Sequence, residues 1–122
     1  MKIIEAINQI DSLKPNAYSI KQKLLWLSQL EAMVRELVIG EGGGEAPTHG
    51  SITDDTDIQT LLLMPSPFDL GYLYWLEAQI HYANEDMDMY NSAITMFNTT
   101  FREYKAHYRR NHASKDTGRF RF

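Results

Sequence analysis

Large apolar side chains recur at alternating steps of three and four residues between residues 86 and 111, and this is the clearest period in the chain. A period of about 3.5 residues predicts one long helix whose narrow apolar seam packs at a shallow angle against another helix. A chain with such a seam needs a second helix to cover it. The seam comprises Met87, Tyr90, Ile94, Phe97, Phe101, Tyr104 and Tyr108.

The covering helix is predicted over residues 67 to 83, directly before a turn at Asn84-Glu85-Asp86. Its start combines a serine cap at Ser66, a proline in the first helical position and an early carboxylate, all typical of helix N-termini. Asn84 suits a left-handed cap, and Asp86 suits the start of the next helix. The two helices should form an antiparallel hairpin, which the second helix outlasts by roughly two turns. The first is apolar almost all round, as a central helix is, through Leu70, Tyr72, Leu73, Trp75, Leu76, Ile80 and Tyr82.

Two more helices are predicted before the hairpin. Isoleucines at helical spacing indicate a short helix over residues 3 to 11, which Pro15-Asn16 ends. Ser19 and Gln22 have the spacing of a capping box, and the helix that they open runs to about Gly40. Its apolar stripe is broad enough to contact neighbours on two sides. The stripe consists of Ile20, Leu24, Leu27, Leu30, Val34 and Leu37, widened by Leu25, Trp26, Met33 and Val38.

A segment without helical period separates these helices from the hairpin. Residues 40 to 60 contain Gly42-Gly43-Gly44 and the acidic Asp54-Asp55-Thr56-Asp57, which predict a long mobile acidic loop. Loops of this length are uncommon in small domains unless they are functional or become ordered on assembly. Residues 61 to 64 should be extended, because the residue before a proline avoids the helical region.

The predicted fold is all-α: a small helical bundle with a long antiparallel hairpin of the third and fourth helices, a mobile acidic loop and a C-terminal tail. Residues 1–112 form one helical domain with its loop at 40–60, and residues 113–122 form a basic aromatic tail. The 122 residues suffice for a single core. The chain has neither an apolar run of about eighteen residues nor a signal-peptide core, so we expect synthesis in the cytoplasm and no membrane segment.

Charge is divided unequally along the chain. Residues 1 to 101 hold five basic and fourteen acidic side chains, whereas residues 102 to 122 hold seven basic and two acidic ones. An acidic body therefore ends in a basic arm. Such an asymmetry indicates a docking or nucleic-acid surface.

Patterns typical of catalysis or metal binding are weak. Two Glu and His pairs, Glu77 with His81 and Glu103 with His107, have helical i, i+4 spacing, but in a hairpin the two histidines would lie roughly 28 Å apart. The pairs also miss the Glu-x-x-His spacing of di-metal bundles, so ordinary surface pairing is the better interpretation. The Asp54 cluster lacks the glycine and glutamate of a calcium loop, and the glycine run lacks the Lys-Ser/Thr of a phosphate loop. With no cysteine and no nucleophile motif, we expect no enzyme, no metal and no cofactor.

The basic arm is the strongest functional candidate. Arg109 and Arg110, followed by Arg119, Phe120, Arg121 and Phe122, could meet phosphates and stack on bases. They could equally anchor in a groove of a protein partner, since aromatic side chains and arginine are the usual interface anchors. A disordered, solubilising tail is the third interpretation. Tyr104 and Tyr108 belong to the seam, which leaves fewer aromatic side chains for bases and favours protein docking.

The order and spacing of several short motifs resemble the small head-to-tail connector (adaptor) proteins of tailed bacteriophages and prophages. The resemblance covers roughly residues 3 to 112. The motifs are Lys14-Pro15-Asn16, Ser19, Lys23, Trp26-Leu27, Leu30-Glu31, Met64-Pro65-Ser66-Pro67-Phe68-Asp69, Tyr72, Leu76-Glu77-Ala78-Gln79-Ile80, Tyr82-Ala83-Asn84, Tyr90-Asn91 and Met96-Phe97-Asn98. The chain departs from the family pattern at Gly71, at Asn84-Glu85 where a glycine turn is more usual, and in the Arg-Phe tail.

The resemblance implies an all-helical structural subunit of the virion neck. Such subunits form a ring of about a dozen copies under the portal protein, extend the DNA channel and present a platform to the next neck or tail-completion protein. DNA would pass through the lumen without specific binding, because an acidic body repels it. By analogy, the arm from Arg109 onward would dock on the portal. A small nucleic-acid-binding regulator that uses the same arm is the alternative, and a helical metalloprotein is a weaker one.

Overall fold

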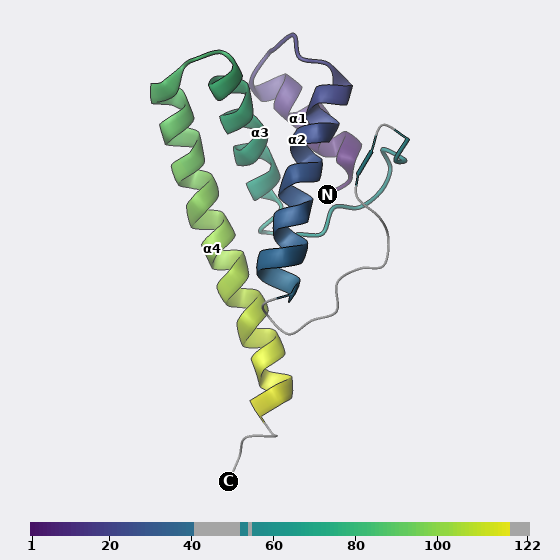
Figure 1. The fold of residues 1–122 in the computed structure, drawn as a ribbon, viewed down its shortest axis with the longest axis vertical. Helices are drawn as coiled ribbons and strands as arrows, with labels where there is room; N and C mark the ends of the chain where they lie inside the picture. Colours follow the sequence, from purple (N-terminus) through teal and green to yellow (C-terminus); the bar gives the residue numbers. More distant parts are fainter. Residues whose placement is uncertain (41–51, 54, 118–122) are drawn as a thin grey trace.

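The computed structural model describes residues 1–40, 52–53 and 55–117, with side chains through residue 112. In these ranges the protein is all-α, as predicted. Figure 1 shows α4 on one side, α3 in the middle, and α2 and α1 on the other side. The elements are α1 (Ile3–Leu13), α2 (Ile20–Met33), a π-helical continuation η1 (Val34–Gly40), α3 (Leu70–Ala83) and α4 (Met87–Thr117).

The antiparallel hairpin of α3 and α4 is confirmed and is the most extensive contact between helices. Its turn differs in one residue from the sequence prediction. Glu85, and not Asn84, takes the left-handed conformation, with φ of 62°, whereas Asn84 stays right-handed with φ of −83°. Asp86 caps α4 as predicted, because its Oδ1 accepts a hydrogen bond from the Met89 N–H at 3.2 Å.

The start of α3 was predicted three residues too early. Residues 66–69 form turns, α3 begins at Leu70, and the N-cap is Asp69, whose side chain makes no capping hydrogen bond. Phe68 explains the difference, because its ring packs against Tyr104 and His107 of α4 at centroid distances of 5.4 and 5.0 Å. The aromatic contact with α4 therefore outweighs the local preference for an earlier helix start.

The helix that Ser19 opens runs to Gly40 as predicted, and the Ser19 Oγ accepts the Gln22 N–H at 3.1 Å. Its last turns, however, are π-helical. The wider turn changes which residues face the core, so that Val38 and Ile39 are buried whereas Leu37 is 38% exposed. The buried positions in these last turns therefore differ from those predicted for a regular α-helix.

The core lies around α3, which contacts α1, α2 and α4. Tyr72 and Leu76 of α3 are fully buried, as the prediction of a central helix requires. Along the predicted seam of α4, Phe97 and Tyr104 are buried, and Tyr90, Ile94, Phe101 and Tyr108 are partly buried. Met87 differs from the other predicted seam residues. Its side chain is 47% exposed, because it lies at the hairpin turn beyond the end of α3.

The extended segment predicted before Pro65 pairs with the start of the chain. Lys2 and Leu61 form an antiparallel β-bridge, and the Leu62 N–H donates to the Met1 carbonyl at 2.9 Å. On the other side of this bridge, the Ile3 N–H donates to the Thr60 carbonyl at 3.0 Å. The Ile4 N–H likewise donates to the Ile58 carbonyl at 2.9 Å, so the segment before Pro65 and the residues preceding it accept N–H groups of the first turn of α1 that have no acceptor within the helix.

Helix α4 is longer than predicted and continues through residues 113–117, which had been assigned to the tail. Gly71 of α3 lies against Thr100, so α4 extends beyond the start of α3 by seventeen residues, or about 25 Å, and not by two turns. Part of this extension is covered, because η1 packs against α4. The basic residues therefore begin on a packed helix.

Candidate interaction surfaces

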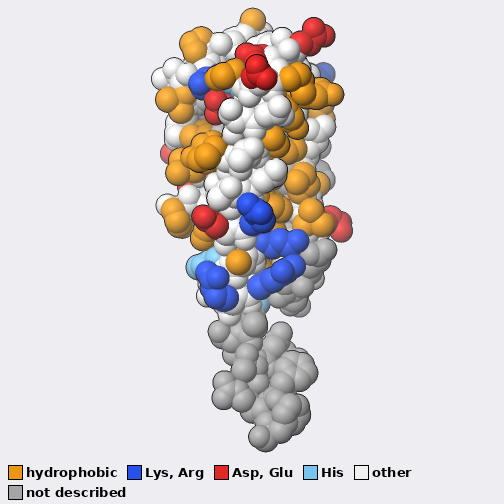
Figure 2. Space-filling model, turned by 90° about the vertical axis from the view of Figure 1, so that its left-hand side faces the viewer, with side chains coloured by type: hydrophobic (Ala, Val, Ile, Leu, Met, Phe, Trp, Pro, Cys, Tyr) orange, Lys and Arg blue, Asp and Glu red, His pale blue; other side chains and the backbone are white. Residues whose placement is uncertain are grey.

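The basic residues of α4 gather on the part of the helix that extends beyond α3. Figure 2 shows them as a cluster of blue side chains low on the described surface of α4, with a few acidic side chains beside it and others near the hairpin turn at the opposite end. Arg102, Arg109 and Arg110 are exposed, and Lys105 is half-buried. The structure thus brings the two predicted docking arginines, Arg109 and Arg110, together with two further cations into one patch.

An aromatic ladder lies along the same part of α4. It begins at Phe68, whose ring contacts Tyr104 and His107. Tyr104 and Tyr108 meet edge to face at 6.2 Å, and Tyr108 stacks on His112 at 3.7 Å. Neighbouring aromatic rings rigidify this stretch of helix, so the cations on it are presented at fixed spacing.

The predicted docking residues Arg119, Phe120, Arg121 and Phe122 lie outside the described residues. The seam residues, by contrast, hold the hairpin together: Trp75 of α3 packs on Phe97 at a centroid distance of 5.0 Å, and Phe97 stacks on Phe101 at 5.4 Å. Of the two tyrosines at the far end of the seam, Tyr104 is buried, whereas Tyr108 is only partly buried.

The two Glu and His pairs have different environments. Glu77 Oε1 lies 3.5 Å from His81 Nε2 and 3.3 Å from Lys14 Nζ, so this carboxylate links α3 to the end of α1. His107 has its Nε2 3.0 Å from Asn111 Nδ2 and its ring against Phe68. Within residues 1–40, 52–53 and 55–112, no three His, Asp or Glu side chains gather in a way that could hold a metal ion.

Glu31 carries a buried polar network that the sequence interpretation missed. Its Oε1 accepts the Tyr72 hydroxyl at 2.5 Å, and its Oε2 accepts the Leu63 N–H at 2.9 Å. The Tyr72 oxygen in turn accepts the Met64 N–H at 2.8 Å. The network ties α2 and α3 to the extended segment 61–64, and the glutamate is only 3% exposed.

Electrostatics in this network suppress ionisation of the tyrosines. Burial raises the pKa of Tyr72 far above its usual value, and the Glu31 carboxylate raises it further. Burial, followed by Tyr108 and Glu31, raises the pKa of Tyr104 to about 12. Both hydroxyls therefore stay protonated well into the alkaline pH range, and Tyr72 donates its hydrogen bond to Glu31.

A second buried charge on α2 is Lys23, 2% exposed, whose Nζ lies 2.6 Å from Asp11 Oδ1 of α1. A signal for both buried charges was present in the sequence. Lys23, Leu27 and Glu31 follow one another at four-residue steps, so the two charges lie in line with an apolar position of the buried stripe. Charged residues in such a line are buried only when they are paired.

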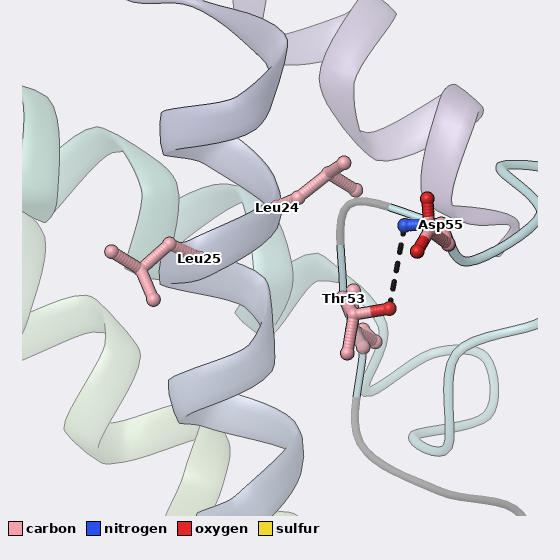
Figure 3. A pocket seen from close by; sticks show the side chains of 5 residues that line it. Leu24, Leu25, Thr53 and Asp55 are labelled. Carbon is pink, nitrogen blue, oxygen red and sulfur yellow. Dashed lines mark hydrogen bonds between the residues drawn. The ribbon is translucent and has the colours of Figure 1, made fainter.

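The hollow between α2 and residues 52–55 offers little chemistry. It is lined by Leu24, Leu25, Ile52, Thr53 and Asp55. Figure 3 shows the Leu24 side chain directed toward the 52–55 segment and Leu25 directed away from it. The Thr53 hydroxyl already accepts the Asp55 N–H at 3.3 Å (Figure 3), and among the described residues that line this hollow Asp55 alone is charged.

Among the helices of the described ranges, none combines the length and the apolar character that a membrane crossing requires. Comparisons of the chain with protein-family models, with curated proteins and with solved structures give no match.

Proposed function

We propose that the protein is a structural subunit of the head-to-tail connector of a tailed bacteriophage. In this role about a dozen copies form a ring on the portal protein, extend the DNA channel and present a platform to the next neck or tail-completion protein. The mature protein would reside in the virion neck after synthesis in the host cytoplasm. The function needs no catalytic site, metal or cofactor.

The observation that carries the proposal is the form of α4. This helix takes its basic residues about 25 Å past the start of α3, beyond an acidic body. A subunit that must reach a neighbouring ring benefits from a rigid, charged extension, because a preordered element loses little entropy on binding. The aromatic ladder of Phe68, Tyr104, Tyr108 and His112 supplies that rigidity.

Further support comes from where the family-like motifs lie in the fold. Lys23 and Glu31 are the two buried charges of α2, and Tyr72 is the buried partner of Glu31. Met64 closes the same network through its backbone N–H. The motifs that carry the resemblance thus include the residues that hold the helices together, as expected for a shared scaffold.

Docking through the basic patch is tested with charge reversals inside the described part of α4. Arg109→Glu combined with Arg110→Glu should weaken binding to portal rings by at least about tenfold, since like charges at an interface cost several kcal/mol. The matched control is Lys21→Glu, an exposed reversal on α2 that should leave the affinity unchanged. Equal affinity of the double variant and the unchanged protein would refute docking through this patch.

The tail is tested separately, by ending the chain after Thr117 or after His112. The first chain lacks residues 118–122 and keeps all of α4, whereas the second also shortens the helix. We expect both to bind portal rings more weakly than the full chain. If the chain ended after His112 binds as tightly as the full one, the arm has no part in docking.

The alternative function is a small nucleic-acid-binding regulator, favoured by the stacked Tyr108 and His112 beside Arg109 and Arg110. It predicts affinity for duplex DNA that falls steeply with salt, with a slope set by the number of phosphates neutralised. The connector proposal predicts weak DNA binding at physiological salt. A fluorescence anisotropy titration at several salt concentrations separates the two.

A further inference from the structure

The outward face of α4 differs from an ordinary solvent-exposed helix face. Residues 89 to 101 contain no Asp, Glu, Lys, Arg or His, although most surface helices carry charge on their exposed side. The face is flanked by acidic residues at one end and basic residues at the other, and Figure 2 shows white and orange atoms between them. Its exposed residues are Met89, Asn91, Ser92, Thr95, Met96, Asn98 and Thr99.

The hydroxyl groups of this face already have partners within α4. Ser92 Oγ donates to the Asp88 carbonyl at 3.3 Å, and Thr95 Oγ1 donates to the Asn91 carbonyl at 2.7 Å. Thr99 Oγ1 donates to the Thr95 carbonyl at 3.1 Å. Because these polar atoms are satisfied inside the helix, covering them with another surface leaves no hydroxyl unpaired.

The face also has the shape and composition of a helix-packing surface. Met89 and Met96 are 41% and 49% exposed, and methionine is enriched in interface cores, where charged residues are depleted. Beside them, Ser92, Thr95 and Thr99 are small enough to let a second helix approach closely. The exposed positions 88, 92, 95, 99 and 102 recur at steps of four and three, the spacing of a contact line on a helix.

The charged residues at the two ends of this face favour a second, antiparallel copy of α4 as its partner. Asp88 and Arg102 are both exposed and lie seven residues to either side of Thr95, about 10 Å each way along the helix. If two copies of α4 cross antiparallel at Thr95, Asp88 of each copy faces Arg102 of the other. A parallel pair would instead set Asp88 against Asp88 and Arg102 against Arg102, which is repulsive.

We propose that α4 binds a second copy of this chain through the uncharged face from Met89 to Phe101, as an antiparallel two-fold pair centred on Thr95. Such a contact pairs one surface with itself, so it closes as a dimer and does not build a ring. The inference is therefore independent of the connector function, in which ring neighbours would use other faces. The contact face is about four helical turns long, so the surface area that it buries is at the low end for a stable interface. The dimer should therefore dissociate on dilution.

The test measures the mass of the isolated protein by sedimentation over a range of concentrations. We expect a reversible shift toward twice 14.1 kDa as the concentration rises. Thr95→Arg brings two like charges together at the two-fold axis and should raise the dissociation constant by at least about tenfold. Gln29→Arg, an exposed change on α2, is the matched control and should leave the constant unchanged.

Charge reversal separates the antiparallel dimer from other forms of association. Asp88→Lys and Arg102→Asp should each weaken the dimer, whereas the double variant, in which every contact is reversed, should restore it. Circular dichroism of each variant checks that the helices are intact. A protein that stays monomeric at all concentrations, or an oligomer whose mass does not respond to Thr95→Arg or to the charge reversals, would overturn the proposal.

A cysteine at position 95 gives an independent readout, because the chain has no cysteine of its own. Two copies of Thr95→Cys would bring their sulfur atoms together at the axis, and we expect a disulfide-linked dimer under mild oxidation. Gln29→Cys should stay monomeric. Equal cross-linking of the two variants would contradict a specific contact at Thr95.

Discussion

At the scale of single residues, Glu31 and its partner Tyr72 bind the backbone of the segment before Pro65. One carboxylate accepts the Tyr72 hydroxyl and the Leu63 N–H, while the Tyr72 oxygen accepts the Met64 N–H. These bonds lie in a nearly dry environment, since Glu31 is 3% exposed and Tyr72 is fully buried. A buried polar network of this kind stabilises the fold only while every member keeps its partner.

Removing the Tyr72 hydroxyl tests this network. Tyr72→Phe should lower the free energy of unfolding by about 1–3 kcal/mol, because the Met64 N–H and a Glu31 oxygen lose their partner. Tyr82→Phe is the matched control on the same helix. Because Tyr82 is 59% exposed, removing its hydroxyl should change the free energy of unfolding by less than about 0.5 kcal/mol. Urea denaturation measures both, and equal stabilities of the two variants would contradict the role given to the network.

The raised tyrosine pKa values predict how stability depends on alkaline pH. Tyr104 has its pKa at about 12 in the folded protein and about 10 when unfolded, so the unfolded chain loses its proton first. The stabilising contribution is complete below pH ~10 and is lost as the pH rises through ~12. Tyr72 acts in the same direction, since its pKa is also raised.

Tyr104→Phe should therefore make the free energy of unfolding fall less steeply between pH ~10 and ~12 than in the unchanged protein. Denaturation curves at a series of pH values check this. The absorbance of tyrosinate gives a second readout, because Tyr72 and Tyr104 should ionise at a higher pH than a tyrosine in water. Parallel pH profiles of the two proteins would show that Tyr104 is not protected by burial.

At the scale of the helices, the hairpin turn contains a strained residue. Glu85 has a φ of 62°, a conformation that costs a residue with a side chain about 1–2 kcal/mol and costs glycine almost nothing. Glu85→Gly should therefore stabilise the protein by about 0.5–1 kcal/mol. Glu103→Gly, in the middle of α4, should destabilise it by about 1 kcal/mol, because glycine is a poor helix former. Thermal denaturation of both variants compares the two positions, and destabilisation by Glu85→Gly would refute the strain.

Gly71 lies where α3 passes close to Met64 and to Thr100 of α4. A Cβ at this position would lie 3.1 Å from Met64 Cε and 3.5 Å from Thr100 Cγ2. Alanine should be nearly neutral, since the flexible end of Met64 can move and the gain in helix propensity offsets the contact. Gly71→Leu should cost about 1–3 kcal/mol by overpacking, as measured by urea denaturation. A leucine variant as stable as the alanine variant would show that the contact is loose.

The helices illustrate what could be predicted from the sequence. The seam of α4 followed from its hydrophobic period, because burial of Phe97 and Tyr104 leaves a regular apolar pattern, whereas the central position of α3 followed from its being apolar almost all round. The π-helical turns of η1 have no comparable signal, since their register depends on what Val38 and Ile39 pack against. Phe68 likewise moved the start of α3 through a contact with α4 that lies far away in the sequence.

The candidate surfaces were predicted only in part. Arg109 and Arg110 were identified from the charge division along the chain, because exposed charges need no packing information. The uncharged face of α4 was overlooked, since serine, threonine and asparagine look like ordinary solvent-facing residues in a sequence. Their significance came from the hydroxyl bonds of Ser92, Thr95 and Thr99 to the helix itself.

At the scale of the whole molecule, charge and rigidity are combined along one axis. The acidic hairpin turn and the basic patch lie at opposite parts of α4, with the uncharged face between them (Figure 2). In a ring of parallel subunits, as the connector proposal requires, this polarity would give one acidic and one basic rim. The basic rim is then the side on which the portal would dock.

The most direct test of the connector proposal is the native mass of the protein mixed with the portal protein encoded in the same genome. The proposal predicts a discrete complex in which each portal ring carries about a dozen copies of this chain, and loss of that complex with Arg109→Glu and Arg110→Glu. A portal ring whose mass does not change in the presence of excess protein would contradict the account.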